Sequence, residues 1–519
     1  MNTTESEAHD PGNRAKATVA LQTVGCKLNQ AESEALARMF LDEGFRLVSP
    51  NESPDIFILN TCTVTHIADR KCRQYLRNFC GRNPNSLVVA LGCYADRDAA
   101  AVGQVEGVDL VIGNAEKGRL VEIIEARLDL QSKPACDKEN RLSTFFSTSE
   151  SPCNQAVRKL LLTPSYPPLA KGDEGSYAFE GHPRSAGLTA SQAPGRKHSA
   201  PLLRQAQNQA LPESLFRTRA MIKIQDGCNH NCSYCIVPHV RGRERSVAAE
   251  TVIAEIKARV GEGCNEVILT GTRIGAYDGV GGLEGLAQRI LDETAVARLR
   301  LSSLQPAELS PSLIRLWKDN QRICRHLHLA LQSGSDPVLR RMDRRYSTGE
   351  YHQMASEVRD AMPDIAITTD VIVGFPGETD AQFEQSYWFC EGIGFADLHI
   401  FPYSARPGTP ASRMPDKVPE RFKKDRSRAM IDLAEQSSRD FRRRFTGKTM
   451  LVLWEEQKED HLWIGHTGNY IKVVTRSNEP LANRLLQTEL GIEHGDALWG
   501  DAQIVANLGE EFRKEDESS

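Results

Sequence analysis

The chain has 519 residues, 40% of them hydrophobic and 26% charged, which predicts several folded domains rather than one. No run approaches the roughly 18 apolar residues of a membrane-spanning helix, so no membrane is expected as a partner. The polar start MNTTESEAHDPGNRAK lacks the apolar stretch of a secretory signal, and a cytoplasmic protein is expected. The net charge of −5 excludes a polycation that coats nucleic acid. Thirteen cysteines in such a chain favour metal ligation or thiol chemistry over disulfides.

After a polar tail at 1–16, residues 17–130 alternate short apolar runs with helical stretches. Strands separated by helices are typical of a parallel sheet, so we expect a doubly wound α/β domain. The expected strands are 18–24, 55–59 and 87–91, and the expected helices are 29–43, 66–80 and 117–130.

Residues 131–215 differ from the segments on either side. They lack hydrophobic periodicity and are rich in Pro, Gly, Ser and Ala, which predicts a linker or a poorly ordered insertion between domains.

Strand and helix patterns return in residues 216–445. Six strands with intervening helices in about 225 residues fit a partial β/α barrel better than a small open sheet. Residues 446–508 read as short strands with little helix, which predicts a small antiparallel β-barrel of OB-like size. A charged tail follows at 509–519. The six strands of the larger barrel are expected at 221–225, 266–271, 298–304, 326–332, 366–374 and 396–403.

The strongest chemical motif is GCNHNCSYC, in which Cys228, Cys232 and Cys235 have the spacing C-x3-C-x2-C. Three thiolates on one loop can hold three irons of a [4Fe–4S] cube and leave the fourth iron free for another ligand. The loop follows the first barrel strand, at the end where barrel active sites lie. The alternative is a structural Cys3His zinc site with His230 or His239, although no second ligand pair is spaced to complete it.

A second set of cysteines lies in the first domain. Cys26, Cys62 and Cys93 each follow a predicted parallel strand, and the carboxyl edge of a doubly wound sheet is where ligands bind. Single buried cysteines are common as small apolar residues, but three at equivalent strand ends predict a second three-thiolate [4Fe–4S] cluster. Cys72 and Cys80 lie on the helix after Cys62 and could support this site. We treat the other cysteines as incidental.

Several motifs in chain order carry a family resemblance. They are TVGCKLNQAESE, LNTC, LGCYA, QDGCNHNCSYCIVPHVRGRERS, LTGTRIGAY and LQSGSD. Together they resemble the radical S-adenosylmethionine (SAM) methylthiotransferases, and GHTGNYIKVV resembles that family's RNA-binding TRAM module. The segments GCKLNQAE, QDGC and RGRERS are most similar to the motifs of the branch that acts on threonylcarbamoyladenosine in tRNA. Ala330 departs from the proline that the family often has before LQSG, and residues 131–215 have no counterpart.

The resemblance implies a transferase that replaces the C2 hydrogen of the modified adenosine beside the tRNA anticodon with a methylthio group. An unactivated aromatic C–H has no acidic proton, so radical chemistry is required. The loop cluster would cleave SAM to a 5′-deoxyadenosyl radical, and the second cluster would carry the sulfur. The resemblance further implies an electron donor such as a flavodoxin-type protein, and a separate sulfur donor. It implies SAM contacts from Tyr234, Thr270, Gly271, Gln332, Ser333 and Gly374.

Evidence for RNA binding is mixed. Residues 421–448 hold ten Lys or Arg against four Asp or Glu, a balance suited to phosphate contacts. Trp454, Trp463 and Tyr470 could stack on bases if they are exposed, but they could equally form the barrel core. Residues 448–507 hold five basic and nine acidic residues, which does not suit a nonspecific RNA clamp.

Three alternatives therefore stay open. The substrate could be a basic ribosomal protein, as the acidic small barrel suggests, or isopentenyladenosine in tRNA. A third alternative, of another class, is a non-catalytic RNA-binding protein with zinc-stabilised domains.

Overall fold

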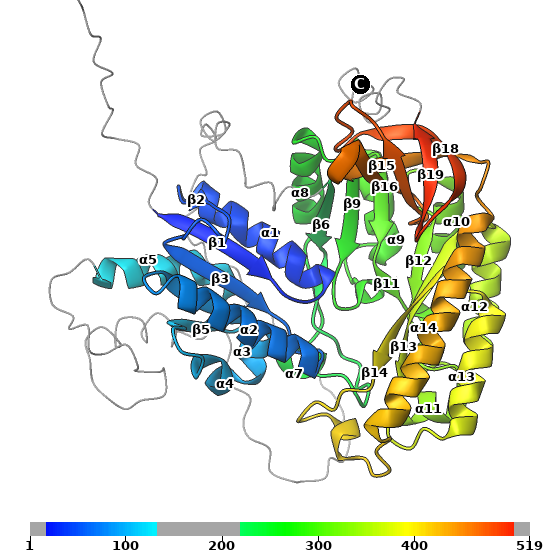
Figure 1. Ribbon diagram of the computed structural model, residues 1–519, viewed down its shortest axis with the longest axis horizontal. Coiled ribbons are helices and arrows are strands. Elements are labelled where there is room, and N and C mark those ends of the chain that lie inside the picture. Colours follow the sequence, from blue (N-terminus) through cyan, green and yellow to red (C-terminus); the bar gives the residue numbers. More distant parts are fainter. Residues whose placement is uncertain (1–16, 132–217, 503–519) are drawn as a thin grey trace, which may run out of the picture. The chain divides into compact units, whose positions relative to one another are not determined.

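The computed structural model describes residues 17–131 and 218–502 (Figure 1). The chain forms two compact units, Met1–Lys117 with Pro212–Ser519, and Gly118–Leu211. The second unit contributes one described α-helix, α5 (Leu120–Gln131). Both tails and nearly all of the expected 131–215 linker, with Cys136 and Cys153, lie outside the described residues, so the boundaries of that linker stay a prediction.

The amino-terminal part of the first unit is a sheet of five parallel strands in the order β2-β1-β3-β4-β5. Every residue of β3 and β4 is buried, as expected for the apolar runs IFILNT and LVVALG in a sheet covered on both faces. The strands are β1 (Thr18–Thr23), β2 (Arg46–Leu47), β3 (Ile56–Thr61), β4 (Leu87–Gly92) and β5 (Leu110–Ile112). The helices are α1 (Lys27–Asp42), α2 (His66–Arg82), α3 (Cys93–Arg97) and α4 (Ala99–Gly103).

Helices α1 and α2 cover opposite faces of this sheet. On one face the ring of Phe57 stacks on Phe79 of α2, with centroids 3.8 Å apart. On the other face Asn60 donates to the backbone oxygen of Asn29 and to the hydroxyl of Ser33, both on α1. The expected doubly wound domain is therefore confirmed. Because β2 and β3 flank β1 on opposite sides, the chain reverses direction across the sheet at the carboxyl end of β1.

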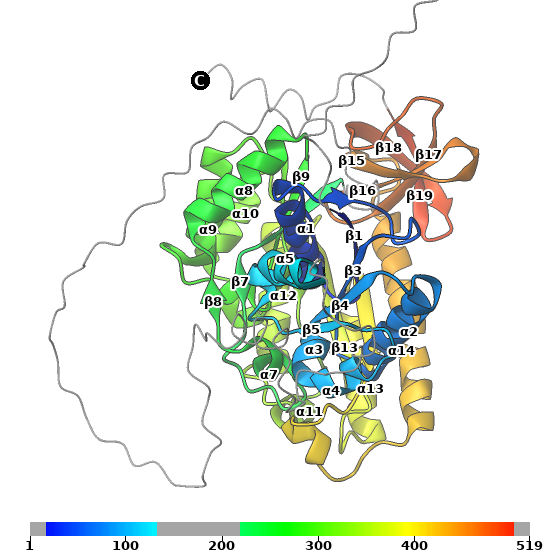
Figure 2. The same ribbon diagram turned by 90° about the vertical axis from the view of Figure 1, so that its left-hand side faces the viewer.

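The next part is an arc of parallel strands, as the expected partial β/α barrel requires. One sheet has the order β10-β9-β6 and the other β11-β12-β13-β14, and only Ser302 separates β10 from β11. Figure 2 shows α8, α9 and α10 side by side along one flank of the arc. The strands are β6 (Arg219–Lys223), β9 (Glu266–Thr270), β10 (Arg298–Leu301), β11 (Ser303–Leu304), β12 (His326–Leu329), β13 (Ala366–Val373) and β14 (Asp397–Pro402). The outer helices are α8 (Ala249–Gly261), α9 (Gly282–Glu293), α10 (Pro311–Asp319), α12 (Thr348–Ala361), α13 (Asp380–Ile393) and α14 (Glu420–Arg443).

Side-chain alternation gives the arc an apolar outer face and a polar inner face. Ile222, Leu299 and Leu327 belong to the core under the outer helices, so their neighbours along each strand point inward. Short elements lie in the loops of the barrel. The strand β7 (Gln225–Asp226) pairs with β8 (Arg245–Ser246), and two short helices, α7 (Val237–Arg241) and α11 (Asp336–Arg341), follow βα turns.

The carboxyl-terminal part is a closed barrel in the order β15-β16-β17-β19-β18. The sequence predicted antiparallel pairing throughout; the structure differs at one seam, where β17 and β19 pair in parallel to close the barrel. Its strands are β15 (Thr449–Gln457), β16 (Leu462–Thr467), β17 (Lys472–Arg476), β18 (Leu485–His494) and β19 (Ala497–Ala502).

The small barrel packs on the amino ends of the larger barrel's strands. Arg298, the first residue of β10, donates to the backbone oxygens of Leu451 and His466. Asn265, just before β9, donates to the backbone oxygen of Asn483. No helix among the described residues is long and apolar enough to cross a bilayer.

Candidate active site

The first cysteine triad lies at the carboxyl edge of the five-stranded sheet. Cys26 precedes α1, Cys62 directly follows β3, and Cys93 directly follows β4 as the first residue of α3. Since β1, β3 and β4 are adjacent and parallel, the three thiols share one edge. The pKa of Cys62 is raised to about 12, mainly by burial and further by the neighbouring Cys26, Cys93 and Cys72 thiols. The structure thus brings the three predicted residues together.

Two glycines allow this convergence. Gly25 has φ +121°, and a Cβ there would lie 2.6 Å from the Cys62 Cβ and 3.0 Å from its Sγ. Gly92 has φ +103°, and a Cβ there would lie 2.6 Å from the Asn60 side-chain oxygen. Only glycine combines this backbone conformation with so close an approach. The backbone conformation and the close packing therefore explain why a glycine precedes Cys26 and another precedes Cys93.

The second triad occupies the segment between β7 and α7, beyond the carboxyl end of β6. The backbone amide of His230 donates to the Cys228 Sγ over 3.4 Å, and the Arg344 guanidinium donates to the Cys232 Sγ over 3.4 Å. Burial raises the pKa of Cys235 to about 12, which the Arg344 charge opposes. Gly227 has φ +74°, and a Cβ there would lie 2.0 Å from the Arg243 backbone oxygen.

The spacing of the thiols bears on which metal centre they fit. Tetrahedral zinc with Zn–S bonds of about 2.3 Å needs its sulfurs about 4 Å apart. In the part of the chain that the structure describes, only His328, Asp370 and His399 bring three His, Cys, Asp or Glu ligand atoms within 4.8 Å of one another. Neither triad, nor the loop triad with His230 or His239, is that compact. Three free thiols that lie farther apart than one zinc ion requires suit a larger cluster better than a single ion.

The predicted SAM contacts lie at the carboxyl ends of barrel strands. Thr270 ends β9 and is buried, and a Cβ at Gly271 would lie 2.8 Å from the Gln225 backbone oxygen. Gln332 has φ +71° and pairs through its backbone with β13. Ser333 is fully buried, with its hydroxyl 3.0 Å from that of Ser386.

The remaining two predicted contacts lie within the segment of the second triad and directly after β13. Tyr234 precedes Cys235, and burial raises its pKa well above the usual value. Gly374 has φ +71°, and its amide donates to the Glu378 carboxylate over 2.6 Å. Because no side-chain arrangement here identifies a ligand, all six SAM contacts stay predictions.

A buried ion network joins α1 of the first triad to the barrel mouth. Glu32 accepts from Lys117 at 2.5 Å, from Arg241 at 2.8 Å and from Lys223 at 3.0 Å. Burial alone would raise the pKa of Glu32, but Lys117 and Arg241 hold it well below its usual range. Arg241 also donates to Asn29, one turn after Cys26. These residues fix α1, and with it the first triad, against the segment that follows the second triad.

Sequence reasoning missed this network. Asn29 and Glu32 lie in GCKLNQAESE, and Arg241 lies in PHVRGRERS, both quoted only for their family resemblance. One signal in the sequence could have revealed the network. Asn29 and Glu32 are polar residues on the apolar face of a predicted helix, directly after the candidate metal ligand Cys26.

The inner face of the barrel is strongly charged. Glu266 on β9 accepts from Arg300 at 2.7 Å and from Arg298 at 3.4 Å, and these arginines lower its pKa to about 2 although burial opposes the shift. Lys27, the first residue of α1, extends toward the same region; burial and the charges of Arg300 and Arg219 lower its pKa to about 8.

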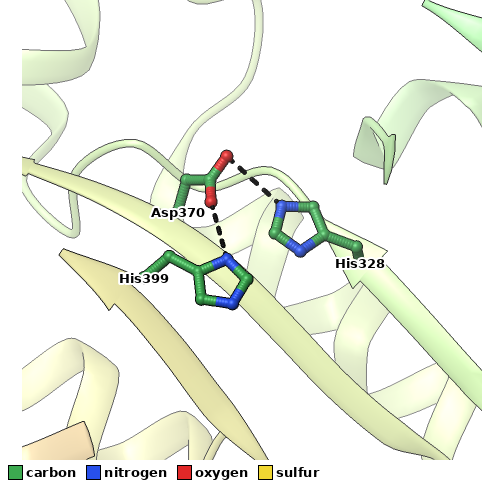
Figure 3. Close-up of side chains that lie close together, drawn as sticks. All are labelled: His328, Asp370 and His399. Carbon is green, nitrogen blue, oxygen red and sulfur yellow. Dashed lines mark hydrogen bonds and ion pairs between the residues drawn. The ribbon is translucent and has the colours of Figure 1, made fainter. Parts of the chain in front are cut away.

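Three further polar side chains lie together on neighbouring inner strands, as Figure 3 shows. Asp370 on β13 lies between two imidazoles: its Oδ2 is 3.4 Å from the Nε2 of His328, and its Oδ1 is 3.2 Å from the Nδ1 of His399. Thr368 contacts the other ring nitrogen of His328 at 3.1 Å. Both histidines hold the pKa of Asp370 far below its usual range against the effect of burial.

Two of the three aromatic residues considered for base stacking lie inside the small barrel. Trp454 and Trp463 are buried in its core, so the structure supports the barrel-core alternative for both over base stacking. Tyr470 instead lies against the guanidinium of Arg300, 3.7 Å from ring centroid to Cζ. The basic 421–448 segment forms most of α14, and Arg443 and Arg444 are exposed at its carboxyl end.

Comparison with known proteins gives two matching family models, the Radical SAM superfamily over residues 222–390 and Uncharacterized protein family UPF0004 over residues 18–113. A solved structure of the radical S-adenosylmethionine methyltransferase TsrM from Kitasatospora setae has a TM-score of 0.50 at 16% identity, covering 76% of this chain and 75% of that one. This likeness supports the fold alone.

Curated relatives extend over most of the chain. The "Threonylcarbamoyladenosine tRNA methylthiotransferase MtaB" of Aquifex aeolicus is 33% identical, covering 88% of this chain and 96% of its own. The protein of the same name from Bacillus subtilis is 30% identical, covering 91% and 94%. The "tRNA-2-methylthio-N(6)-dimethylallyladenosine synthase" of Geobacter sulfurreducens is 31% identical, covering 94% and 98%.

Proposed function

This chain belongs to the radical SAM tRNA methylthiotransferases, enzymes that use SAM and a [4Fe–4S] cluster, and we propose that it methylthiolates C2 of N6-threonylcarbamoyladenosine beside the tRNA anticodon. Relatives at 30% and 33% identity carry that activity in their names, but a relative named for dimethylallyladenosine is 31% identical. Identity alone therefore does not choose between the two adenosine substrates.

The charged interior of the barrel is the observation that favours threonylcarbamoyladenosine over dimethylallyladenosine. A dimethylallyl group is a hydrocarbon and would place apolar surface against the charged side chains of this inner face, such as Arg300 and Glu266. A threonylcarbamoyl group offers a urea, a hydroxyl and a carboxylate. The His328–Asp370–His399 set adds hydrogen-bonding groups to the same inner face. This lining favours the polar substituent.

We assign two [4Fe–4S] clusters, one to each cysteine triad. Cys228, Cys232 and Cys235 would hold the cluster that supplies an electron to SAM, and Cys26, Cys62 and Cys93 would hold the cluster that carries the sulfur. The protein's own contribution is to place the two triads: the Gly25 and Gly92 backbones admit the strand-end thiols, and Glu32 with its cationic partners fixes α1 at the barrel mouth.

The remaining assignments follow from the same chemistry. The predicted SAM contacts at the strand ends would position that cofactor beside the loop cluster. Reductive cleavage needs an electron donor, for which a flavodoxin-type protein is suited, and each inserted sulfur must be replaced by a sulfur donor. The exposed Arg443 and Arg444 at the end of α14 provide cations for tRNA phosphates.

Mass spectrometry of tRNA nucleosides and of ribosomal proteins, from cells with and without the gene, tests this function. We expect the methylthio form of threonylcarbamoyladenosine to disappear in the deletion strain and to return when the gene is restored. Loss of a methylthio group from dimethylallyladenosine, or from a ribosomal protein, with threonylcarbamoyladenosine unchanged, would assign one of the alternative substrates instead.

A further inference from the structure

Lys27 is a partly buried cation that has no ion-pair partner among the described residues. Its ammonium makes no hydrogen bond and no ion pair with any residue in 17–131 or 218–502, and it lies over the ring of Tyr470, 5.7 Å from the centroid. As the first residue of α1 it also lies at the positive end of the helix dipole, where a cation is unfavourable. Stability does not explain a lysine at this position.

The direction of the Lys27 side chain follows from its neighbour one turn along. Ala31 lies on the same face of α1 and packs against Met221 and Ile268, which point to the inside of the barrel. Lys27 therefore reaches from the residue after Cys26 into the barrel interior. Its position links the strand-end triad to the charged inner face.

The surroundings of Lys27 are already rich in positive charge. Arg219 and Arg300 lie against the same Tyr470 ring, 5.4 Å and 3.7 Å from its centroid. Arg300 is satisfied by Glu266 and by the Gly468 backbone oxygen. Arg219 pairs with a single carboxylate oxygen.

The anionic groups that the structure describes nearby do not balance this set. The carboxylates of Glu266 and Glu455 are shared among Arg219, Arg298, Arg300 and His466. The next carboxylate, Asp370, is held by two imidazoles. Within residues 17–131 and 218–502, Lys27 therefore has no counter-ion, and a partly buried cation in this state favours an anion bound from outside.

We propose that Lys27, with Arg219 beside it, binds the carboxylate of the threonylcarbamoyl group and thereby makes the enzyme specific for adenosines that carry an anionic N6 substituent. This inference rests on the proposed function. In adenine, C2 and the carbon that bears N6 flank the same ring nitrogen. A base whose C2 faces the sulfur at the strand-end triad therefore directs its N6 substituent to groups close to Cys26, and Lys27 is the adjacent residue.

The experiment uses the reconstituted holoenzyme and two anticodon stem-loop RNAs. One carries threonylcarbamoyladenosine, and the other carries the same nucleoside with its carboxylate converted to a primary amide. The variants are Lys27→Met, which keeps the chain length and removes the charge, Lys27→Arg, and Lys71→Met as a control from the exposed face of α2. Turnover is measured with SAM and reductant, and RNA affinity with SAM but without reductant.

We expect wild type to prefer the acid RNA over the amide RNA by about 10- to 100-fold in kcat/KM and in affinity, as for a hydrogen bond to a charged group. Lys27→Met should abolish this preference, whereas Lys27→Arg and Lys71→Met should keep it. Iron content and SAM cleavage should be unchanged in all variants.

Two results would overturn the inference. One is a Lys27→Met enzyme that still discriminates between the acid and the amide. The other is a variant that loses SAM binding or iron, because Lys27 would then serve the SAM carboxylate or the cluster. Failure of the proposed function looks different: wild type itself would leave threonylcarbamoyladenosine RNA unmodified.

Discussion

The two cysteine triads are built in opposite ways. The loop triad comes from one short segment, so its geometry depends on local turns and on Gly227, which passes close to the Arg243 backbone. The strand-end triad comes from residues 26, 62 and 93 and exists only when three parallel strands are in register. The loop triad therefore depends on a correctly folded loop, whereas the strand-end triad depends on the fold of the whole domain.

The largest expected difference concerns the reaction itself. Cys232→Ala should reduce SAM cleavage to background, since two thiolates hold a cube poorly. Cys62→Ala should keep SAM cleavage but lose methylthio transfer. Both products, 5′-deoxyadenosine and the methylthiolated nucleoside, can be quantified by chromatography. Cys72→Ala, which removes the neighbouring buried thiol, should retain both activities; full methylthiolation by Cys62→Ala would refute the assignment.

Glycine variants should damage one centre at a time. Gly25→Ala forces a Cβ to 2.6 Å from Cys62, and Gly227→Ala forces one to 2.0 Å from a backbone oxygen, each at a positive φ. We expect Gly25→Ala to lose about four irons and methylthio transfer while keeping SAM cleavage, and Gly227→Ala to lose SAM cleavage.

The matched control for the glycine pair is Gly81→Ala in α2, where a Cβ meets nothing within 4 Å. That variant should keep both clusters and gain up to about 1 kcal/mol in unfolding free energy. Equal iron loss from Gly25→Ala and Gly81→Ala would show that the close approach to Cys62 is unimportant.

Two residues of α1 allow a buried ion-pair site to be compared with an exposed one. Glu32→Gln leaves Lys117 and Arg241 without their shared carboxylate, so we expect a loss of about 3 kcal/mol in unfolding free energy. Arg38→Met removes the exposed pair with Glu262 and should cost less than about 1 kcal/mol. Denaturant unfolding under anaerobic conditions measures both.

The Glu32 effect should depend on pH in one direction. The folded-state pKa of Glu32 is lowered, so its contribution is complete above its ordinary value of 4.5 and is lost as pH falls toward the folded value. The difference between wild type and Glu32→Gln should therefore be constant from pH 8 to about pH 5 and shrink below that. A difference that grows with acidity would contradict the charge network.

The smallest expected effect is on reduction potential. Arg344 donates to Cys232 at 3.4 Å, and Asn114 donates to Cys93 at 3.8 Å. A variant at either residue therefore removes one hydrogen bond to the sulfur of one predicted cluster ligand. Arg344→Met removes a positive charge and should lower the potential of the loop cluster. Asn114→Leu removes a neutral donor and should lower that of the strand-end cluster by less. Redox titration followed by electron paramagnetic resonance measures both; a shift in the opposite cluster would contradict the pairing.

The fold and both triads could be predicted because their signals are periodic or local. Apolar runs such as LVVALG mark buried strands, and a cysteine after each run marks a shared edge. Trp454 and Trp463 could not be placed, since alternation along a barrel strand does not say which face is covered until the barrel closes.

The partners of Glu32 and the surroundings of Lys27 could not be predicted, for a related reason. Glu32 and Arg241 meet only because α1 packs on a barrel that begins about 200 residues later. The missing ion-pair partner of Lys27 becomes visible only once its possible partners within 17–131 and 218–502 have positions. Long-range polar contacts carry no periodic signal along the chain.

Iron and acid-labile sulfide counting on the anaerobically reconstituted chain tests the central claim of two separable clusters most directly. The same count is made on a variant with Cys26, Cys62 and Cys93 all changed to Ala, and on one with Cys228, Cys232 and Cys235 all changed. We predict about eight irons for the wild type and about four for each variant, with an equal amount of sulfide. About four irons in the wild type, unchanged when the strand-end cysteines are removed, would contradict the account.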